Sequence, residues 1–196
     1  MIGYRILNKS KPGTVLLIHG LFTTAGYWLS YLASLREFRL IILEIDYKEI
    51  SDCASYVRNI LDIIQTEAGG RVDVVIAHSL GTLISSQLPR EARTCSFEIC
   101  PVYRATRLNQ NEFVSEIRRK NKFILHEGEI RSILRDVDNA VAQHATYKQS
   151  IPSRLIYLPD SDLYFSYESD PADKVFKGDH FDINEAFTDI RNVLSL

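Results

Sequence analysis

The sequence predicts an α/β domain with a mainly parallel sheet that is covered on both faces by helices. Strands are expected at 14–18, 39–45 and 72–77, where the apolar runs 15–18, 40–43 and 74–77 suit burial on both faces of a parallel sheet. Segments with helical apolar spacing alternate with these runs, as expected of strand–helix–strand units. The 196 residues are 45% apolar, which is enough for a single domain, residues 1–196, with a substantial core.

The first half of the chain alternates strands and helices. Thr23 or Thr24 can cap the first helix, because both precede a segment with apolar residues at helical spacing. Ser51 or Asp52 can cap the second helix, and Gly69-Gly70 ends it. The expected elements are an edge strand at 4–7, strands at 14–18, 39–45 and 72–77, and helices at about 25–36 and up to about residue 65.

The second half continues the alternation but contains a long interruption. Pro89 ends a helix that begins at Leu80, since proline cannot continue a helix interior. Asn109 can cap the first of two further helices, and Asp182 or Asn184 can cap the closing helix. The expected elements are helix 80–88, strand 96–102, a helix after residue 109, helix 128–147, strands 154–158 and 174–177, and a closing helix.

The interruption predicts a helical insertion at residues 106–150. From 108 to about 149 there is no strand pattern, and the segment is longer than usual connections. An insertion after the C-terminal end of a strand in an α/β fold lies over the active site, so we expect a lid. An ordinary pair of crossover helices is the alternative.

Composition excludes several classes of protein. The net charge of −2 provides no basic field for nucleic acid or an anionic membrane. There is no apolar run of 18 residues and no signal-peptide pattern, so we expect no membrane span. The cysteines Cys53, Cys95 and Cys100 have no metal-ligand spacing, and their small odd number suits reduced thiols in the cytoplasm. We expect no metal and no cofactor.

Residues 74–84 predict a nucleophile at a tight strand-to-helix turn. The β-branched strand 74–76 leads into the pattern small–x–Ser–x–Gly, in which Ala77 and Gly81 flank Ser79. Such a turn lifts the serine hydroxyl clear of the sheet. It also leaves the backbone N–H of Leu80 free to stabilise an oxyanion. The alternative is a strand end with an incidental serine.

Residues after three other strands complete the expected site. Gly20 lets the chain turn away after strand 14–18, which makes the N–H of Leu21 the second candidate oxyanion donor. A nucleophilic serine needs a base and an acid that orients the base, in the chain order Ser, Asp, His for this type of sheet. His180 is the candidate base. Asp162 is the preferred acid, and Asp160 remains the alternative.

These residues resemble the motifs of the α/β-hydrolase superfamily. The resemblance rests on residues 19–22, 77–81 and 178–181 together with Asp160 and Asp162, and it extends over nearly the whole chain. It implies a compact α/β-hydrolase fold and an acyl-enzyme mechanism through the Ser-His-Asp triad.

Within the superfamily, the chain is most similar to type II thioesterases of polyketide and nonribosomal peptide synthesis. Residues 178–181 look like their Gly-x-His-Phe segment, and 108–114 look like the opening of their lid. Residues 134–135, Tyr147 and 151–152 look like the exit of the lid. The resemblance implies release of acyl groups from the phosphopantetheine of an acyl or peptidyl carrier protein. The chain departs from the family in its shorter length, in its Leu21-Phe22 loop and at Ala77.

Four functions use or inherit this arrangement. The first is hydrolysis of acyl thioesters, for which the basic segment 118–122 is a candidate contact for an acidic carrier protein; a solvated helix end is the alternative reading of that segment. The second is a carboxylesterase or lipase-like activity on oxygen esters. The third is an acyltransferase or cyclase, and the fourth is a non-catalytic binding module on the same scaffold.

Overall fold

The computed structural model describes residues 2–47, 50, 52–120, 125–144, 154–168, 170 and 173–195. A seven-stranded sheet forms the centre of the protein, with strand order β1-β3-β2-β4-β5-β7-β9. Only β1 pairs antiparallel, at one edge. The predicted α/β class is therefore confirmed. The strands are β1 (Gly3–Leu7), β2 (Gly13–Ile18), β3 (Phe38–Glu44), β4 (Val72–His78), β5 (Arg93–Ile99), β7 (Arg154–Pro159) and β9 (Lys174–Phe176).

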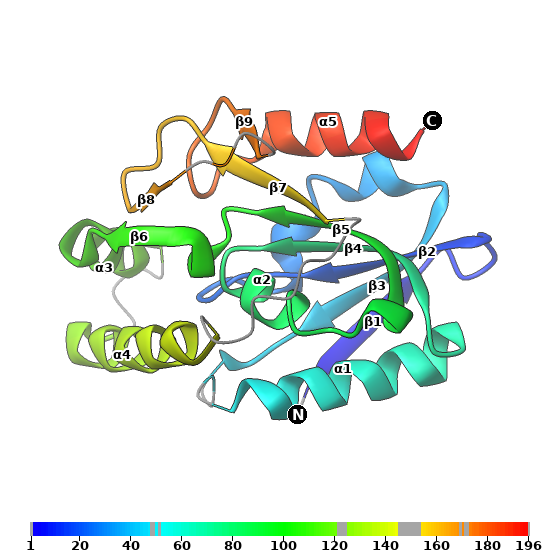
Figure 1. The fold of residues 1–196 in the computed structure, drawn as a ribbon, viewed down its shortest axis with the longest axis horizontal. Coiled ribbons are helices and arrows are strands. Elements are labelled where there is room, and N and C mark those ends of the chain that lie inside the picture. Colours follow the sequence, from blue (N-terminus) through cyan, green and yellow to red (C-terminus); the bar gives the residue numbers. More distant parts are fainter. Residues whose placement is uncertain are drawn as a thin grey trace.

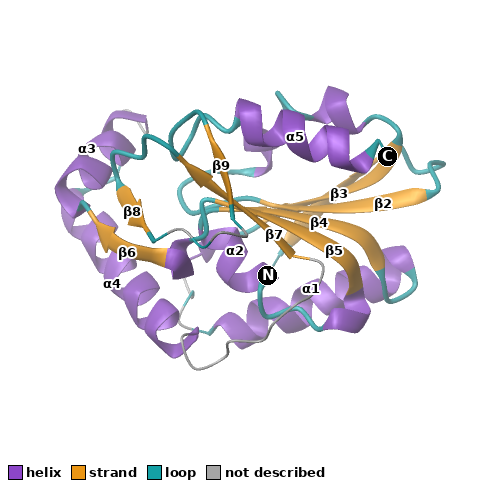
Figure 2. Ribbon diagram, turned by 45° about the horizontal axis from the view of Figure 1, so that its top comes forward, coloured by secondary structure: helices purple, strands orange, loops and turns teal. Residues whose placement is uncertain are grey.

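Helices cover both faces of the sheet (Figures 1 and 2). Alternate residues of the buried strands face opposite apolar clusters, so that Leu16 and Leu17 of β2 belong to different ones. One cluster is closed by α5, and the other by α1 and α2. The helices are α1 (Cys53–Ala68), α2 (Leu80–Ser85), α3 (Gln110–Lys120), α4 (Glu127–His144) and α5 (Asn184–Leu194). None of the described helices is long and apolar enough to cross a membrane.

The ends of α1 follow from its flanking residues. The Asp52 carboxylate accepts the Ser55 N–H at 3.1 Å and caps the helix. Gly69 ends it in a left-handed conformation with φ of 64°, which glycine adopts without strain. Ser51, the alternative cap, lies outside the described residues.

The predicted helix at 25–36 is wrong in type, because two short 3₁₀ helices take its place: η1 (Ala25–Trp28) and η2 (Leu32–Leu35). The Thr24 side chain caps η1. Buried side chains recur every third residue, at Ala25, Trp28 and Tyr31, and this spacing matches the three residues per turn of a 3₁₀ helix.

Other boundaries differ by a few residues. The strand predicted at 96–102 begins and ends three residues earlier, and the helix predicted to reach Leu88 ends at Ser85. Pro101 explains the first difference, because it removes a donor and begins the short turn η5 (Val102–Arg104). A further 3₁₀ turn, η4 (Arg90–Ala92), precedes β5.

A second, two-stranded sheet was not predicted. It pairs β6 (Ala105–Leu108) antiparallel with β8 (Phe165–Tyr167), and it lies beside α3 and α4 beyond the main sheet (Figure 1). The apolar faces of α3 and α4 belong to the same cluster as α1 and α2. The sequence features at Asn121, Lys122, Tyr147 and 151–152 lie outside the described residues.

Candidate active site

Ser79 lies on a strained turn between β4 and α2. Its φ of 53° and ψ of −122° are unusual for a residue with a side chain. The turn is crowded, because a Cβ on Gly81 would lie 2.6 Å from the carbonyl oxygen of His19, and a Cβ on Gly20 would lie 2.8 Å from the Cβ of Ser79. Close approach of neighbouring atoms therefore requires glycine at both positions.

The structure brings Ser79, His180 and Asp162 into one chain of hydrogen bonds. Ser79 Oγ lies 2.7 Å from His180 Nε2, and His180 Nδ1 lies 3.1 Å from Asp162 Oδ2. The side chains of His180 and Asp162 are only 1% and 2% exposed. Because a carboxylate only accepts, Nδ1 carries the proton and Nε2 is free to accept the Ser79 hydroxyl proton.

Asp160 is not part of this chain. It is exposed, and its Oδ1 accepts hydrogen bonds from the Gly178 N–H at 3.1 Å and the Ser161 hydroxyl at 3.0 Å. Asp162 is fixed differently: its Oδ1 accepts the N–H groups of Tyr164 and Phe165, at 2.8 and 3.0 Å. The turn made by these bonds leaves Oδ2 directed at His180.

The loop that carries His180 is held by its own backbone contacts. Gly178 has φ of 154°, and a Cβ there would lie 2.2 Å from the carbonyl oxygen of Asp182. Asp179 Oδ1 accepts the N–H groups of Phe181 and Asp182 at 2.6 and 2.8 Å, which stabilises the loop. His180 is therefore presented on a fixed turn.

Leu80 and Leu21 both line the cavity that contains Ser79. Leu80 is the first residue of α2, where backbone N–H groups have no partner within the helix. Leu21 follows Gly20 at the end of β2. The two expected oxyanion donors therefore belong to residues on the same cavity wall as the nucleophile candidate.

A cavity of about 160 Å³ opens beside Ser79 between the core and the helices α3 and α4. Its wall is mostly apolar and its mouth is polar, because Thr106, Arg107 and Asp138 are exposed. Partial burial raises the pKa of Asp138. The apolar wall is formed by Val102, Leu108, Phe113, Leu134, Val137, Val141 and Phe165.

Three other histidines lie outside the chain of hydrogen bonds formed by Ser79, His180 and Asp162. His19 donates through Nδ1 to the Gly20 carbonyl at 2.8 Å and accepts the Ile45 N–H through Nε2 at 3.0 Å, which orders the first loop. His126 is exposed at the start of α4. His144 is buried and its Nε2 lies 2.6 Å from the hydroxyl of Ser86, so it packs α4 against α2.

His78 contacts the backbone of the candidate base, His180. Its Nε2 donates to the backbone carbonyl of His180 at 2.7 Å, and its ring stacks on Tyr27 with centroids 4.7 Å apart. Burial lowers the pKa of His78 well below its ordinary value, and the neighbouring His180 lowers it further. His78 is thus held neutral.

The neutral state of His78 predicts a loss of stability in acid. Its folded pKa lies below the unfolded value of about 6.5, so its stabilising contribution is complete above that pH and is lost as the pH falls. We expect His78→Gln to reduce the dependence of the unfolding free energy on pH below 6.5, by up to about 1.4 kcal/mol per pH unit. Denaturant titrations at several pH values measure this. The control His126→Gln changes an exposed histidine; a pH dependence unchanged by His78→Gln would contradict the assignment.

Phe165 is a site residue that was not predicted. Its ring stacks on that of His180 with centroids 4.5 Å apart. Phe165 also lines the cavity, so it lies between the base and the cavity. No sequence pattern marked it, because the three-residue strand β8 was not predicted. A second aromatic side chain, Phe181, meets His180 edge-on at 5.2 Å.

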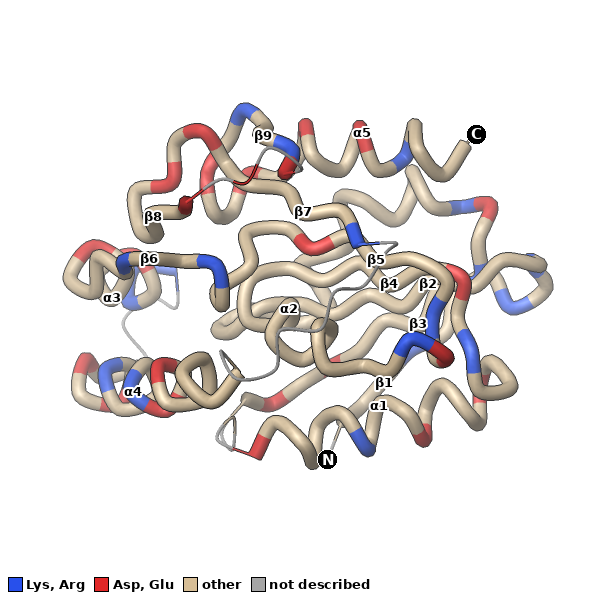
Figure 3. Tube along the Cα trace, in the orientation of Figure 1, with Lys and Arg blue, Asp and Glu red and all other residues tan. Residues whose placement is uncertain are grey.

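The basic side chains at the C-terminal end of α3 contact neighbouring side chains of the protein. Arg119 contacts Glu116 at 2.6 Å, Arg118 lies 3.8 Å from Glu127, and Lys120 sits over the ring of Phe181 at 3.2 Å. Basic and acidic residues alternate along α3 and α4 (Figure 3). Glu116 and Glu127 therefore offset part of the positive charge at this end of the helix.

Comparisons with known proteins bear on the fold and the family of this chain. No curated protein matches the sequence significantly. Among solved structures, a thioesterase domain from the curacin biosynthetic pathway has a TM-score of 0.68 at 13% identity and covers 100% of this chain and 95% of its own. A monoacylglycerol lipase from Paleococcus ferrophilus has a TM-score of 0.67 at 13% identity, covering 99% and 96%. An alpha/beta superfamily hydrolase from Oenococcus oeni PSU-1 has a TM-score of 0.70 at 12% identity, covering 99% and 95%.

Because all three sequence identities are low, these similarities show a common fold and nothing more. The sequence itself matches the alpha/beta hydrolase family over residues 15–189, a stretch that includes Ser79, Asp162 and His180. The chain belongs to the alpha/beta hydrolase family.

Proposed function

We propose that the protein is a serine hydrolase of acyl thioesters, with Ser79 as nucleophile, His180 as base and Asp162 as the acid that orients the base. The observation that carries this proposal is the continuous chain of hydrogen bonds, 2.7 Å and 3.1 Å, that ends at a cavity. A hydroxyl paired with a neutral imidazole is the arrangement that activates serine near neutral pH.

The reaction follows from the positions of these groups. Ser79 Oγ attacks the acyl carbonyl carbon while His180 Nε2 accepts its proton, and Asp162 stabilises the imidazolium. The N–H groups of Leu80 and Leu21 stabilise the oxyanion. His180 then protonates the leaving thiol, and an acyl-serine remains. Water then loses a proton to His180 and attacks the acyl carbon. His180 returns that proton to Ser79 Oγ as the acyl–oxygen bond breaks and the acid is released.

The cavity supports an apolar acyl group of moderate size. A dry apolar cavity of about 150 Å³ accommodates benzene, so a volume of about 160 Å³ fits an acyl chain of about six carbons. Helices α3 and α4 supply Phe113, Leu134 and Val137 to its wall. This arrangement supports a lid function for the predicted insertion at 106–150, because its helices α3 and α4 contribute part of the cavity wall.

A substitution in the wall should change chain-length preference. We expect Val137→Phe to lower kcat/KM for a hexanoyl substrate by about tenfold relative to an acetyl substrate, because the larger ring fills the space that the longer chain needs. Parallel kinetics with both substrates measure this. Ile133→Phe is the matched control, since Ile133 is half-buried on α4 but does not line the cavity. An equal loss for both substrates in Val137→Phe would contradict the assignment of the acyl pocket.

The leaving group is tested with matched substrates. Hexanoyl-pantetheine thioester and hexanoyl esters of comparable leaving-group acidity should be compared, with kcat/KM higher for the thioester. The thioesterase domain among the structural neighbours supports this choice. Free acyl-pantetheine is the first substrate to test, and an acyl-loaded carrier protein is the second. The order follows from Arg118, Arg119 and Lys120, which contact neighbouring side chains of the protein itself.

An oxygen-ester hydrolase is the second candidate. The apolar wall contributed by α3 and α4, together with the monoacylglycerol lipase among the neighbours, favours it. Preference for the hexanoyl ester would support this candidate and leave the roles of Ser79, His180 and Asp162 unchanged. Transfer of the acyl group to an added amine or alcohol in place of water would instead indicate an acyltransferase.

A further inference from the structure

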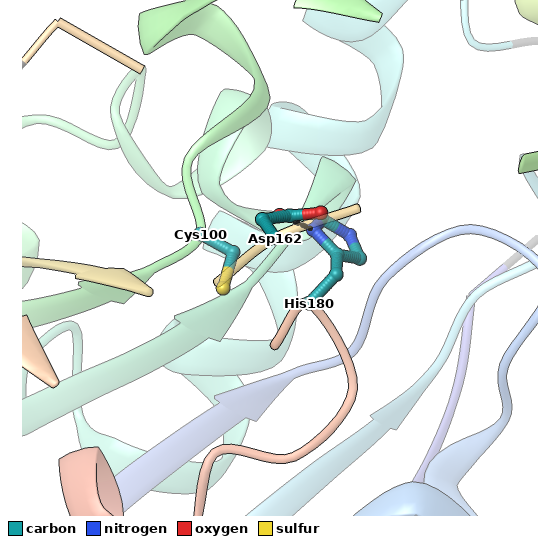
Figure 4. Close-up of side chains that lie close together, drawn as sticks. All are labelled: Cys100, Asp162 and His180. Carbon is teal, nitrogen blue, oxygen red and sulfur yellow. Dashed lines mark hydrogen bonds and ion pairs between the residues drawn. The ribbon is translucent and has the colours of Figure 1, made fainter. Parts of the chain in front are cut away.

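Cys100 lies beside Asp162 and His180, the acid and the base of the proposed mechanism. One ligand atom each from Cys100, Asp162 and His180, drawn together in Figure 4, lie within 4.8 Å of one another. Cys100 is fully buried and follows β5, and its backbone has φ of 52°. Its N–H donates to the Tyr157 carbonyl at 2.9 Å, which fixes that conformation and the direction of the side chain.

We propose that Cys100, Asp162 and His180 form an inhibitory binding site for Zn²⁺. Thiolate, imidazole and carboxylate are the ligands that zinc prefers, and three protein ligands with an open fourth position are common in zinc sites. With bond lengths of about 2.0–2.3 Å, ligand atoms of a tetrahedral site lie about 3.3–3.8 Å apart. His180 Nδ1 and Asp162 Oδ2 are 3.1 Å apart, and all three ligand atoms lie within 4.8 Å of one another, so small adjustments of the side chains bring the set to these separations.

The charge of this set suits a buried position. Cys100 releases its proton to solvent when it binds, and the thiolate and the Asp162 carboxylate together balance the two charges of the metal. His180 binds as the neutral imidazole, and its ring proton moves from Nδ1 to Nε2. The site is therefore neutral overall, which avoids the cost of an uncompensated buried charge.

A second cavity provides the entry path. It measures about 360 Å³, lies along Asp162 and is lined by Asp160, Ser166 and Tyr167 among others. Phe165 lines both this cavity and the acyl cavity beside Ser79, and the other lining residues of the two cavities differ. Zinc can thus approach the acid without crossing the acyl cavity.

Binding would switch off the proposed catalytic base. When Nδ1 is bound to zinc, Nε2 carries a proton and donates to Ser79 instead of accepting from it. The serine then has no base. This consequence depends on the proposed function, whereas zinc binding itself does not, so the two are measured separately.

The test titrates metal-free protein with Zn²⁺ against a chromophoric chelator, without substrate. We expect one zinc per chain, release of one proton, and at least about tenfold weaker binding in Cys100→Ser, since a serine hydroxyl is a poor zinc ligand. Co²⁺ should give a thiolate-to-cobalt absorption band that Cys100→Ser removes. Cys95→Ser is the matched control, because the Cys95 thiol lies outside the cluster. If Cys100→Ser does not fold, Cys100→Gly removes the thiol and suits the positive φ.

Absence of a bound zinc, or equal affinity in wild type and Cys100→Ser, would overturn the site. With the site established, added Zn²⁺ should inhibit hydrolysis reversibly, and a chelator should restore it. Zinc that binds through Cys100 without inhibiting would support the metal site and contradict the role of His180 in the proposed function.

Discussion

Ser79→Ala is expected to lower kcat by about 10⁴- to 10⁶-fold, the range found when the nucleophile of a serine hydrolase is removed. The substitution deletes only Oγ, and alanine has the same Cβ at φ of 53°, so the turn is no more strained than before. The thermal unfolding midpoint should therefore stay close to that of wild type. Single-turnover and steady-state assays with a hexanoyl thioester, together with thermal unfolding, measure both quantities.

Ser86→Ala is a matched control for this result. Ser86 is also buried and also lies within hydrogen-bond distance of a histidine, His144 at 2.6 Å, but it is remote from the cavity wall. Its loss should leave kcat within a few-fold of wild type. Turnover in Ser79→Ala within tenfold of wild type, or an equal loss in Ser86→Ala, would contradict the assignment of Ser79 as nucleophile.

Asp162→Asn is expected to lower kcat by about 10⁴-fold. An amide NH₂ placed opposite Nδ1 favours the imidazole tautomer that carries its proton on Nε2, and that tautomer cannot accept the Ser79 proton. The asparagine oxygen can still accept the N–H groups of Tyr164 and Phe165, so the turn is retained. The effect should therefore appear in kcat with little change in thermal stability.

Asp160→Asn is the control for the acid, because it makes the same chemical change two residues away. Asp160 bonds to Gly178 and Ser161 on the surface, so its substitution should change kcat only slightly. Comparable losses in the two variants, or a larger loss in Asp160→Asn, would mean that the acid has been assigned to the wrong residue.

The main sheet was predictable because its strands have a strong pattern. Residues 14–18 and 74–77 are buried, and burial on both faces of the sheet favours continuous apolar runs. The strands β6 and β8 have only four and three residues and are partly exposed, so their sequences carry no comparable pattern. The segment 25–36 was read as one helix because apolar residues at three-residue spacing also occur in α-helices.

The candidate site was predictable where the chain itself constrains it. Ser79 was recognisable because Gly81 marks the crowded turn, and His180 followed from the chain order of the three groups. The choice between Asp160 and Asp162 was open, since both follow β7 within three residues; the turn closed by Asp162 Oδ1 distinguishes their directions. Cys100 could not be predicted, because residues from three distant segments meet only in the folded chain.

Covalent trapping tests most directly whether Ser79 is the nucleophile. Wild-type protein is treated with a fluorophosphonate bearing a six-carbon chain, and the adduct is located by intact-protein and peptide mass spectrometry. We expect one adduct per chain on Ser79, loss of hydrolysis in proportion to labelling, and no adduct in Ser79→Ala. A stoichiometric adduct on another residue, or undiminished hydrolysis after Ser79 has been fully labelled, would contradict this role of Ser79.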